Sequence, residues 1–251
     1  MGMRSMAFAA ALTLAASSAW ASEAAKIPRQ NWSFGGIFGT FDRAQLQRGF
    51  TVYKNVCSAC HGMNLIAYRN LTEIGFSEDE VKAIAAEYEV TDGPNDEGEM
   101  FQRPARPSDR FRKPFANENA ARAANNGAAP PDLSLMIKAR EDGANYVYAL
   151  LTGYGEPPAD MKMADGMIYN KHFPGGQIAM APPISEGVVE YADGTKATME
   201  QVSRDVVAFL AWVAEPEMEA RKRLGVKVIL FLLVLTGMLY AVKRKVWADV
   251  H

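Results

Sequence analysis

The apolar positions of the chain recur mostly at the 3.6-residue spacing of an α-helix. Between Asp42 and Cys60 they lie on one helical face, and Asp42 with Gln45 has the pattern of a helix N-cap. Further helices are predicted from Ser77, over 118–126, over 142–152 and from Thr198. Strand patterns are few and short, the clearest being Val188–Tyr191 before an Asp-Gly turn. The pattern therefore predicts a mainly α domain.

The first twenty-one residues have the pattern of a secretory signal peptide. Arg4 supplies the positive charge, an apolar stretch spans 6–16, and Ala19-Trp20-Ala21 resembles a cleavage site. A buried N-terminal helix is the alternative. If residues 1–21 are a signal peptide, they are removed, and a domain spanning 22–220 is exported from the cytoplasm.

A second apolar run lies near the other end of the chain. Residues 224–242 contain a single charge, Lys227, which is long enough to reach the membrane surface. Basic residues flank the run on both sides, so the positive-inside rule gives no orientation. The predicted signal peptide indicates the orientation instead, because it places the residues before the span outside the cytoplasm. Residues 221–245 are predicted to form a transmembrane anchor with basic flanks, and 246–251 a cytoplasmic tail; the alternative is a buried core helix.

Pro- and Gly-rich composition predicts loops over 92–116 and 154–187. Both are longer than a simple connection needs, and loops of that length are usually functional or wrapped around a bound group. Pro216 either separates the helix that starts at Thr198 from the anchor or kinks one continuous helix.

Composition places the chain among folded proteins, with 49% hydrophobic and 22% charged residues. A mean hydropathy of −0.13 is too polar for several membrane spans and compatible with one. An isoelectric point near 6.0 argues against nucleic acid as the partner. These values exclude wholesale disorder and a multi-span transporter, and they argue against nucleic acid as the main partner.

Acidic residues dominate the predicted exported domain. Of the 27 Lys and Arg residues, 19 lie in 22–220, whereas 28 of the 29 Asp and Glu residues do. Between Glu78 and Glu99 there are nine acids against Lys82 alone. Such a run is either a solvated face or a surface that attracts a basic partner, since opposite charges raise encounter rates.

The only two cysteines of the chain lie in Cys57-Ser58-Ala59-Cys60-His61, the attachment signature of a c-type haem. Cysteines three positions apart can both bond to the porphyrin, and the next residue, His61, can reach the iron. Thioredoxin-like redox chemistry gives the adjacent histidine no such role. A zinc site would need two further Cys or His ligands, and no other Cys exists.

A six-coordinate haem needs a second axial ligand, commonly Met or His. Met180 lies among small residues and before two prolines, which would let a stiff loop approach a flat ring. Met161, Met163 and Met167 belong to a loop of similar freedom, and Met often only fills cores. The remaining histidines are His172 and His251. Residue patterns alone leave these candidates open.

Together these motifs resemble the cytochrome c1 family over nearly the whole predicted mature chain. The matching segments are R-G-F-x-V-Y-K-x-V-C-x-x-C-H at 48–61, D-G-P-N at 92–95, G-E-M-F at 98–101, A-R-A-A-N-N-G-A-x-P-P-D-L-S at 121–134, L-T-G-Y at 151–154, the Met180 loop and A-E-P-E at 214–217. The resemblance implies the fold class: a mainly α c-type cytochrome haem domain, with long loops around one haem and a single C-terminal transmembrane helix.

The resemblance also implies a set of haem contacts. One covalently bound haem c would be held by Cys57 and Cys60, with His61 and Met180 on the iron. Arg140 matches an arginine near a haem propionate. Pro131 and Tyr146 match positions of the pocket wall.

The family's role implies an electron-transfer subunit of quinol:cytochrome c oxidoreductase. It would take one electron from the Rieske iron–sulfur protein, beside cytochrome b, and pass it to a soluble basic cytochrome c through the segment Glu78 to Glu99. The chain itself would break no bonds; the complex is the enzyme. The expected location is the bacterial cytoplasmic membrane, with membrane lipid around one span and the haem domain on the periplasmic side. A free-standing tethered shuttle and a haem peroxidase are the alternatives.

Overall fold

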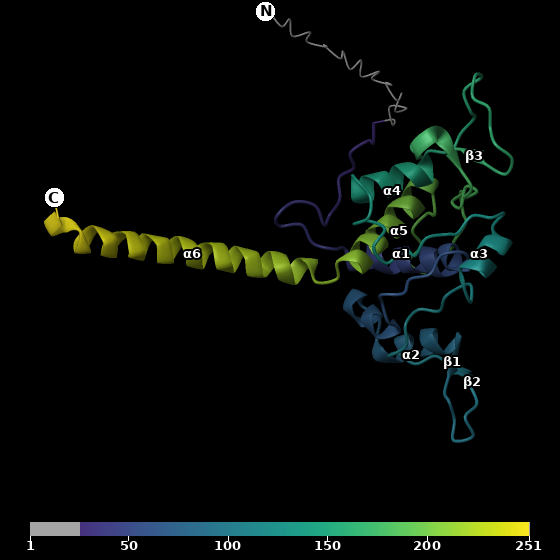
Figure 1. Ribbon diagram of the computed structural model, residues 1–251, viewed down its shortest axis with the longest axis horizontal. Helices are drawn as coiled ribbons and strands as arrows, with labels where there is room; N and C mark the ends of the chain where they lie inside the picture. Colours follow the sequence, from purple (N-terminus) through teal and green to yellow (C-terminus); the bar gives the residue numbers. More distant parts are fainter. Residues whose placement is uncertain (1–25, 251) are drawn as a thin grey trace, which may run out of the picture.

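The computed structural model describes residues 26–250, so the predicted signal peptide lies outside the described residues. A small, mainly helical domain occupies 26–214, and one long helix, α6, extends away from it (Figure 1). The predicted mainly α fold with a single C-terminal apolar helix is therefore confirmed.

Short helices form most of the regular structure. The helices are α1 Arg43–Asn55, α2 Glu78–Ala86, α3 Glu118–Ala124, α4 Gly143–Thr152, α5 Met199–Ala214 and α6 Met218–Val246. The 3₁₀ turns are η1 Cys57–Ala59, η2 Tyr68–Ile74, η3 Pro174–Gly176 and η4 Ala248–Val250. The strands are β1 Glu89–Asp92, β2 Phe101–Pro104, β3 Ile168–Tyr169 and β4 Gln177–Ile178.

Side-chain caps set the starts of three helices where the sequence predicts them. The Asp42 carboxylate accepts from the backbone N–H of Gln45 at 3.2 Å. Ser77 and Glu80 form the reciprocal capping box of α2. The Thr198 hydroxyl starts α5 in the same way. Such a cap stabilises a helix by about 1 kcal/mol, because it satisfies an otherwise unpaired donor.

The helix predicted up to Cys60 ends earlier, at Asn55. Residues 57–59 form the tighter turn η1 instead, and the backbone N–H groups of Cys60 and His61 both donate to the Cys57 carbonyl, at 3.1 and 2.9 Å. The two cysteines are therefore placed by a 3₁₀ turn that follows α1, rather than by the helix itself.

The predicted strand Val188–Tyr191 is wrong. This segment is a bend followed by irregular chain, and the side chains of Val189 and Tyr191 pack into the core. The apolar alternation reflects burial without a pairing strand. Strands β2, β3 and β4 lie instead in the two predicted loops, and β1 ends at Asp92, where the first of these loops begins. β1 pairs antiparallel with β2, with Glu89 opposite Pro104, and β3 pairs with β4. Both hairpins are too short for an alternating pattern to reveal them.

Helices α1 and α5 pack against each other more extensively than any other pair of helices in the described domain. A Cβ on Gly49 would lie 2.1 Å from the Asp205 carbonyl oxygen and 2.6 Å from the Phe209 Cβ. Only glycine permits this approach. Around the crossing, Phe50 and Tyr53 of α1 pack against Phe209, with ring centroids 5.8 and 6.0 Å apart. This contact fixes the helix that leads into the Cys57 turn.

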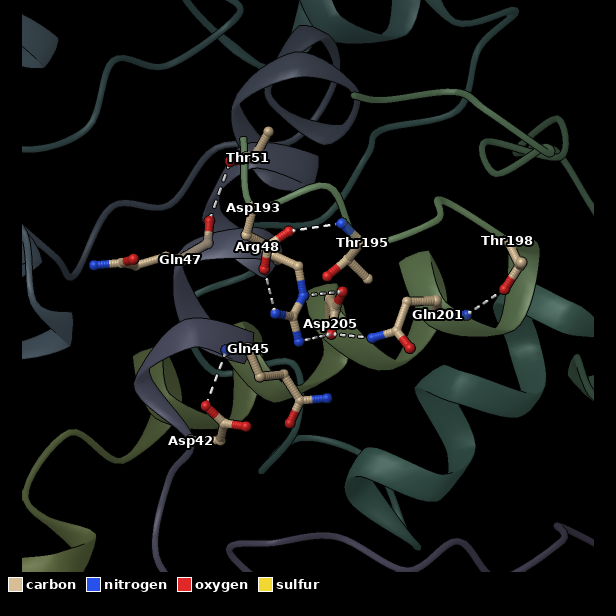
Figure 2. Close-up of polar contacts among 10 residues, drawn as sticks. All are labelled: Asp42, Gln45, Gln47, Arg48, Thr51, Asp193, Thr195, Thr198, Gln201 and Asp205. Atoms are coloured by element: carbon tan, nitrogen blue, oxygen red, sulfur yellow. Dashed lines mark hydrogen bonds and ion pairs between the residues drawn. The ribbon is translucent and has the colours of Figure 1, made fainter. Parts of the chain in front are cut away.

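A buried ion pair joins the same two helices (Figure 2). Arg48 Nε donates to Asp205 Oδ2 at 3.0 Å, and the Asp205 side chain is fully buried. Gln201 donates to the other Asp205 oxygen, and Arg48 Nη1 reaches Asp193 at 2.8 Å. Burial alone would lower the pKa of Arg48. The hydrogen bonds and charges of Asp205 and Asp193 outweigh that effect, so the pKa of Arg48 is raised overall. The Thr195 backbone N–H and Arg48 lower the pKa of Asp193 to about 2.

Residues 215–217 separate α5 from α6, so the two are distinct helices rather than one kinked helix. The apolar part of α6 has a mean hydropathy of 2.2 and none of it is buried in the domain (Figure 1). A helix of 29 residues with this composition is long enough to cross a bilayer.

Candidate haem-binding site

The Cys57 and Cys60 thiols are both free, the first partly buried and the second exposed. They lie at the two ends of one 3₁₀ turn, and Ser58 Oγ donates to the Lys54 carbonyl at 2.7 Å, which ties the turn to the end of α1. The pair is thus fixed relative to the core, with the Cys60 thiol open to solvent. This geometry suits two thioether bonds to one flat group.

Burial raises the pKa of the Cys57 thiol to about 12. A redox-active cysteine of the thioredoxin type requires the opposite shift, because the thiolate is the reacting species. The structure therefore disfavours dithiol redox chemistry at this motif.

The His61 ring is oriented by a single backbone acceptor. Its Nδ1 lies 2.8 Å from the Pro131 carbonyl oxygen, which leaves Nε2 as the nitrogen that can bind iron. Metal-bound histidines are commonly held in this way by a bond from the other ring nitrogen. Burial lowers the His61 pKa, so the ring is neutral near pH 7, as a metal ligand must be.

Three further bonds run between the chain after His61 and the segment around Asp132. Leu133 N–H donates to the Gly62 carbonyl, Asn64 N–H donates to the Asp132 carboxylate, and Leu65 N–H donates to the buried Ser134 hydroxyl. The distances are 2.8 to 3.0 Å. Segment 131–134 is therefore a fixed support for the histidine.

Met180 is half-buried in a bend directly after β4. The Tyr154 hydroxyl donates to the Met180 carbonyl oxygen at 3.0 Å, and Tyr154 pairs with the buried Asn170. Asn170 Nδ2 donates to the Leu150 carbonyl at 2.7 Å, at the end of α4. Met180 is therefore supported from α4, whereas His61 is supported by α1 and segment 131–134.

The other candidate iron ligands have different environments. Met161 lies against Gly176, where an added Cβ would be 2.9 Å from its Cε. Met167 is 41% exposed. His172 is buried beside Gly153, with its ring 2.8 Å from where a Cβ would be. His251 lies outside the described residues. Met163 is half-buried in the same loop as Met161. Among the candidates that the structure describes, Met180 alone combines half-burial with a side-chain hydrogen bond to its carbonyl, from Tyr154.

Replacing Tyr154 by Phe should loosen the Met180 loop without unfolding the domain. The change removes a hydrogen bond worth about 1 kcal/mol and keeps the ring. We expect a small rise in the fraction of ferrous protein that binds carbon monoxide, measured by absorption spectroscopy. Tyr148→Phe is the control, because Tyr148 is a half-buried tyrosine of α4 that packs against Trp32. Equal carbon monoxide binding in the two variants would contradict a role for Tyr154.

Arg140 and Tyr146 are brought together, although both were predicted only from the resemblance. Arg140 is exposed, and its guanidinium neighbours the Tyr146 hydroxyl. Burial raises the Tyr146 pKa, and Arg140 offsets part of that rise. Pro131 contributes its carbonyl to His61. Their contacts with a haem remain predictions.

Sequence reasoning gave no role to Tyr154, Asp132, Ser134 or Asn170. The first three lie inside the matched segments L-T-G-Y and P-P-D-L-S, so the signal was present without a function attached. Asn170 had no such signal, because a buried asparagine in a loop is visible only in the folded chain.

The predicted acidic segment forms α2 and the β1–β2 hairpin, which projects from the domain (Figure 1). All nine acids are exposed except Asp92, which is half-buried and paired with Arg103. Lys54 and Lys82 pair with Glu87 and Asp79. Most of the negative charge is therefore free to face a partner.

Known proteins resemble this chain throughout. The model of the Cytochrome C1 family matches residues 32–250. Cytochrome c1 from Rhodospirillum rubrum is 52% identical over 88% of this chain and 88% of its own length. The protein named "Cytochrome c1 1, heme protein, mitochondrial" from Arabidopsis thaliana is 56% identical over 82% of this chain and 67% of its own length. Cytochrome b/c1 from Bradyrhizobium diazoefficiens is 52% identical over 90% of this chain, which spans 36% of that relative's length.

Two free thiols on one turn and a neutral, oriented imidazole fit a c-type haem, and the predicted electron-transfer role agrees with these relatives. The chain belongs to the cytochrome c1 family, the electron-transfer subunit of the cytochrome bc1 complex.

Proposed function

We propose that this chain holds one haem c and carries single electrons from the Rieske iron–sulfur protein to a soluble basic cytochrome c. The observation that carries the proposal is the turn of Cys57 and Cys60 followed by His61, whose ring is bonded to Pro131. When bound, the haem iron supplies the one-electron redox chemistry. The chain's residues do the rest: they attach, orient and shield it.

Each of these residues has a distinct task. Cys57 and Cys60 would attach the haem through thioether bonds, and His61 Nε2 and the Met180 sulfur would bind its iron. A thioether sulfur favours ferrous iron, so Met180 would hold the potential above that of a bis-histidine haem. Arg140 would pair with a propionate, and Pro131 and Tyr146 would line the pocket.

The acidic surface of α2 and the β1–β2 hairpin is the docking surface for the electron acceptor. Its exposed carboxylates attract a basic cytochrome c and raise the encounter rate at low ionic strength. Screening by salt shortens the range of this attraction, so the rate of cytochrome c reduction should fall as salt rises.

Membership of the complex distinguishes this proposal from a free-standing electron shuttle. The haem domain joins α6 through only residues 215–217, which leaves no long tether for a mobile carrier. Purification in mild detergent should yield a b-type cytochrome and an iron–sulfur protein with the chain. Elution of the chain alone, with its haem intact, would favour the shuttle.

Membrane topology is the finer part of the proposed location. We place the haem domain on the periplasmic side of the cytoplasmic membrane, because residues 1–21 have the pattern of an export signal. Protease added to spheroplasts should remove the haem domain and leave a C-terminal epitope tag protected. Cleavage of the tag together with the domain would reverse this orientation.

A further inference from the structure

An exposed apolar loop lies beside the start of α6. Residues 35–39 form the loop Gly-Gly-Ile-Phe-Gly, and its tip presents Ile37 and Phe38 at 71% and 84% exposure. No large apolar side chain in the described part of the chain is more exposed, including those of α6. Two adjacent side chains of this kind are costly to leave in water.

The base of the loop is held by a hydrogen bond and by ring packing, so the fold itself keeps the tip exposed. Thr40 N–H donates to the Ser33 carbonyl at 3.0 Å and closes the loop. Phe34 stacks on Trp32 and packs on Phe41, with ring centroids 5.4 and 5.3 Å apart. The apolar residues at the base therefore join the core, and the apolar pair at the tip does not.

Bonds from α6 fix the loop next to the apolar span. Lys222 Nζ donates to the Phe34 and Gly39 carbonyls, at 2.8 and 3.1 Å. These carbonyls flank the tip, and Lys222 is two residues before Leu224, where the apolar run of α6 begins. Glu219, one turn earlier, accepts from the Phe41 N–H at 2.7 Å. Figure 1 shows the loop on the side from which α6 leaves.

We propose that this loop is a second membrane contact, in which Ile37 and Phe38 enter the boundary between lipid headgroups and acyl chains beside α6. We identify the contacting molecule as phospholipid, because the loop tip adjoins the apolar run of α6, whose side chains would themselves face lipid. Arg221 and Arg223, at the entry, pair with Glu215 and Glu219, but their side chains remain 61% and 75% exposed and can also meet anionic headgroups. Two contacts, unlike one helix, fix the tilt of the haem domain on the membrane.

The test measures the surroundings of the tip in the full-length holoprotein. The proposed function commits both native cysteines to haem, so Ile37→Cys or Phe38→Cys supplies one free thiol for a nitroxide. The protein is placed in vesicles of phosphatidylcholine with a minority of phosphatidylglycerol. Spin relaxation by oxygen, which concentrates in lipid, is compared with relaxation by a water-soluble nickel chelate. Asp96→Cys on the hairpin is the aqueous control, and Leu232→Cys in α6 is the lipid control.

We expect the oxygen-to-nickel ratio at positions 37 and 38 to lie clearly above that at 96 and below that at 232, as for an interfacial segment. Lys222→Met should lower the ratio at both positions because it removes the bonds to the loop base. Lys227→Met, which has no such bonds, is its matched control and should leave the ratio unchanged.

Water-like ratios at 37 and 38, with a lipid-like ratio at 232, would overturn the loop contact and leave the anchor intact. Water-like ratios at all three positions would overturn both. The labelled chain should also be measured in the intact complex. If the tip is water-like in the vesicles and becomes shielded from both probes only in the complex, a partner subunit covers it and the lipid proposal fails.

Discussion

Replacing Met180 by Leu should lower the reduction potential of the haem and open the iron to exogenous ligands. Leucine has nearly the same volume and no sulfur, so the domain should fold and keep its covalent haem. Removing the thioether destabilises ferrous iron more than ferric iron, because the soft sulfur binds the reduced state more strongly. A one-electron centre becomes tenfold harder to reduce for each ~59 mV of lost potential.

The functional result should be large. Electron transfer from the iron–sulfur donor to the haem becomes uphill. A potential lowered by more than ~59 mV should therefore reduce the rate of quinol-driven cytochrome c reduction by more than about tenfold. Carbon monoxide should bind the ferrous variant and fail to bind the parent. Redox titration, steady-state assay and absorption spectra check the three outcomes.

Met163→Leu is the matched control. Met163 is half-buried in the loop before β3, and its loss should alter neither the potential nor carbon monoxide binding. If Met180→Leu titrates at the parental potential and still excludes carbon monoxide, Met180 is not the ligand. The buried His172 then becomes the next candidate.

The haem motif and the helices were predictable because they depend on local sequence. The caps at Asp42, Ser77 and Thr198 act within three residues, so their patterns identify helix starts directly. The early end of α1 was not predictable, since the apolar spacing continues through Cys57 and Cys60 into the 3₁₀ turn. The sequence pattern records which residues are apolar and cannot record which kind of turn carries them.

The supports of the site were hidden for a different reason. Pro131 binds His61 across 70 positions of the chain, and Tyr154 reaches Met180 across 26. Such pairs arise only when the fold brings distant segments together. The segment Val188–Tyr191 shows the converse error, in which alternating burial in irregular chain imitates a strand.

Replacing Arg48 by Met should cause a large loss of stability in this domain. Arg48 is the cation that compensates the fully buried Asp205 carboxylate at the α1–α5 contact. Its removal leaves a buried carboxylate without a cation, held by the uncharged Gln201 amide, and breaking a buried pair in this way costs about 3–5 kcal/mol. Methionine keeps the apolar part of the side chain, so the effect reports the lost charge.

A chain of this size should then melt on the order of 10 °C lower, at about 2–4 °C for each kcal/mol. Thermal unfolding of the holoprotein, followed by circular dichroism, measures the shift. Arg122→Met is the matched control, because Arg122 pairs with Glu118 on the exposed face of α3. Exposed pairs contribute about 0–1 kcal/mol, so this variant should melt near the parent.

A second substitution separates the buried charge from a general packing defect. Asp205→Leu in the Arg48→Met background removes the uncompensated carboxylate, and replacing a whole buried pair by apolar residues is often neutral or stabilising. The double variant should therefore recover most of the lost stability, and with it the level of holoprotein, because α1 leads into the turn that holds Cys57 and Cys60. If the double variant melts below Arg48→Met, the pair acts through shape rather than charge, and the electrostatic account of the α1–α5 contact is wrong.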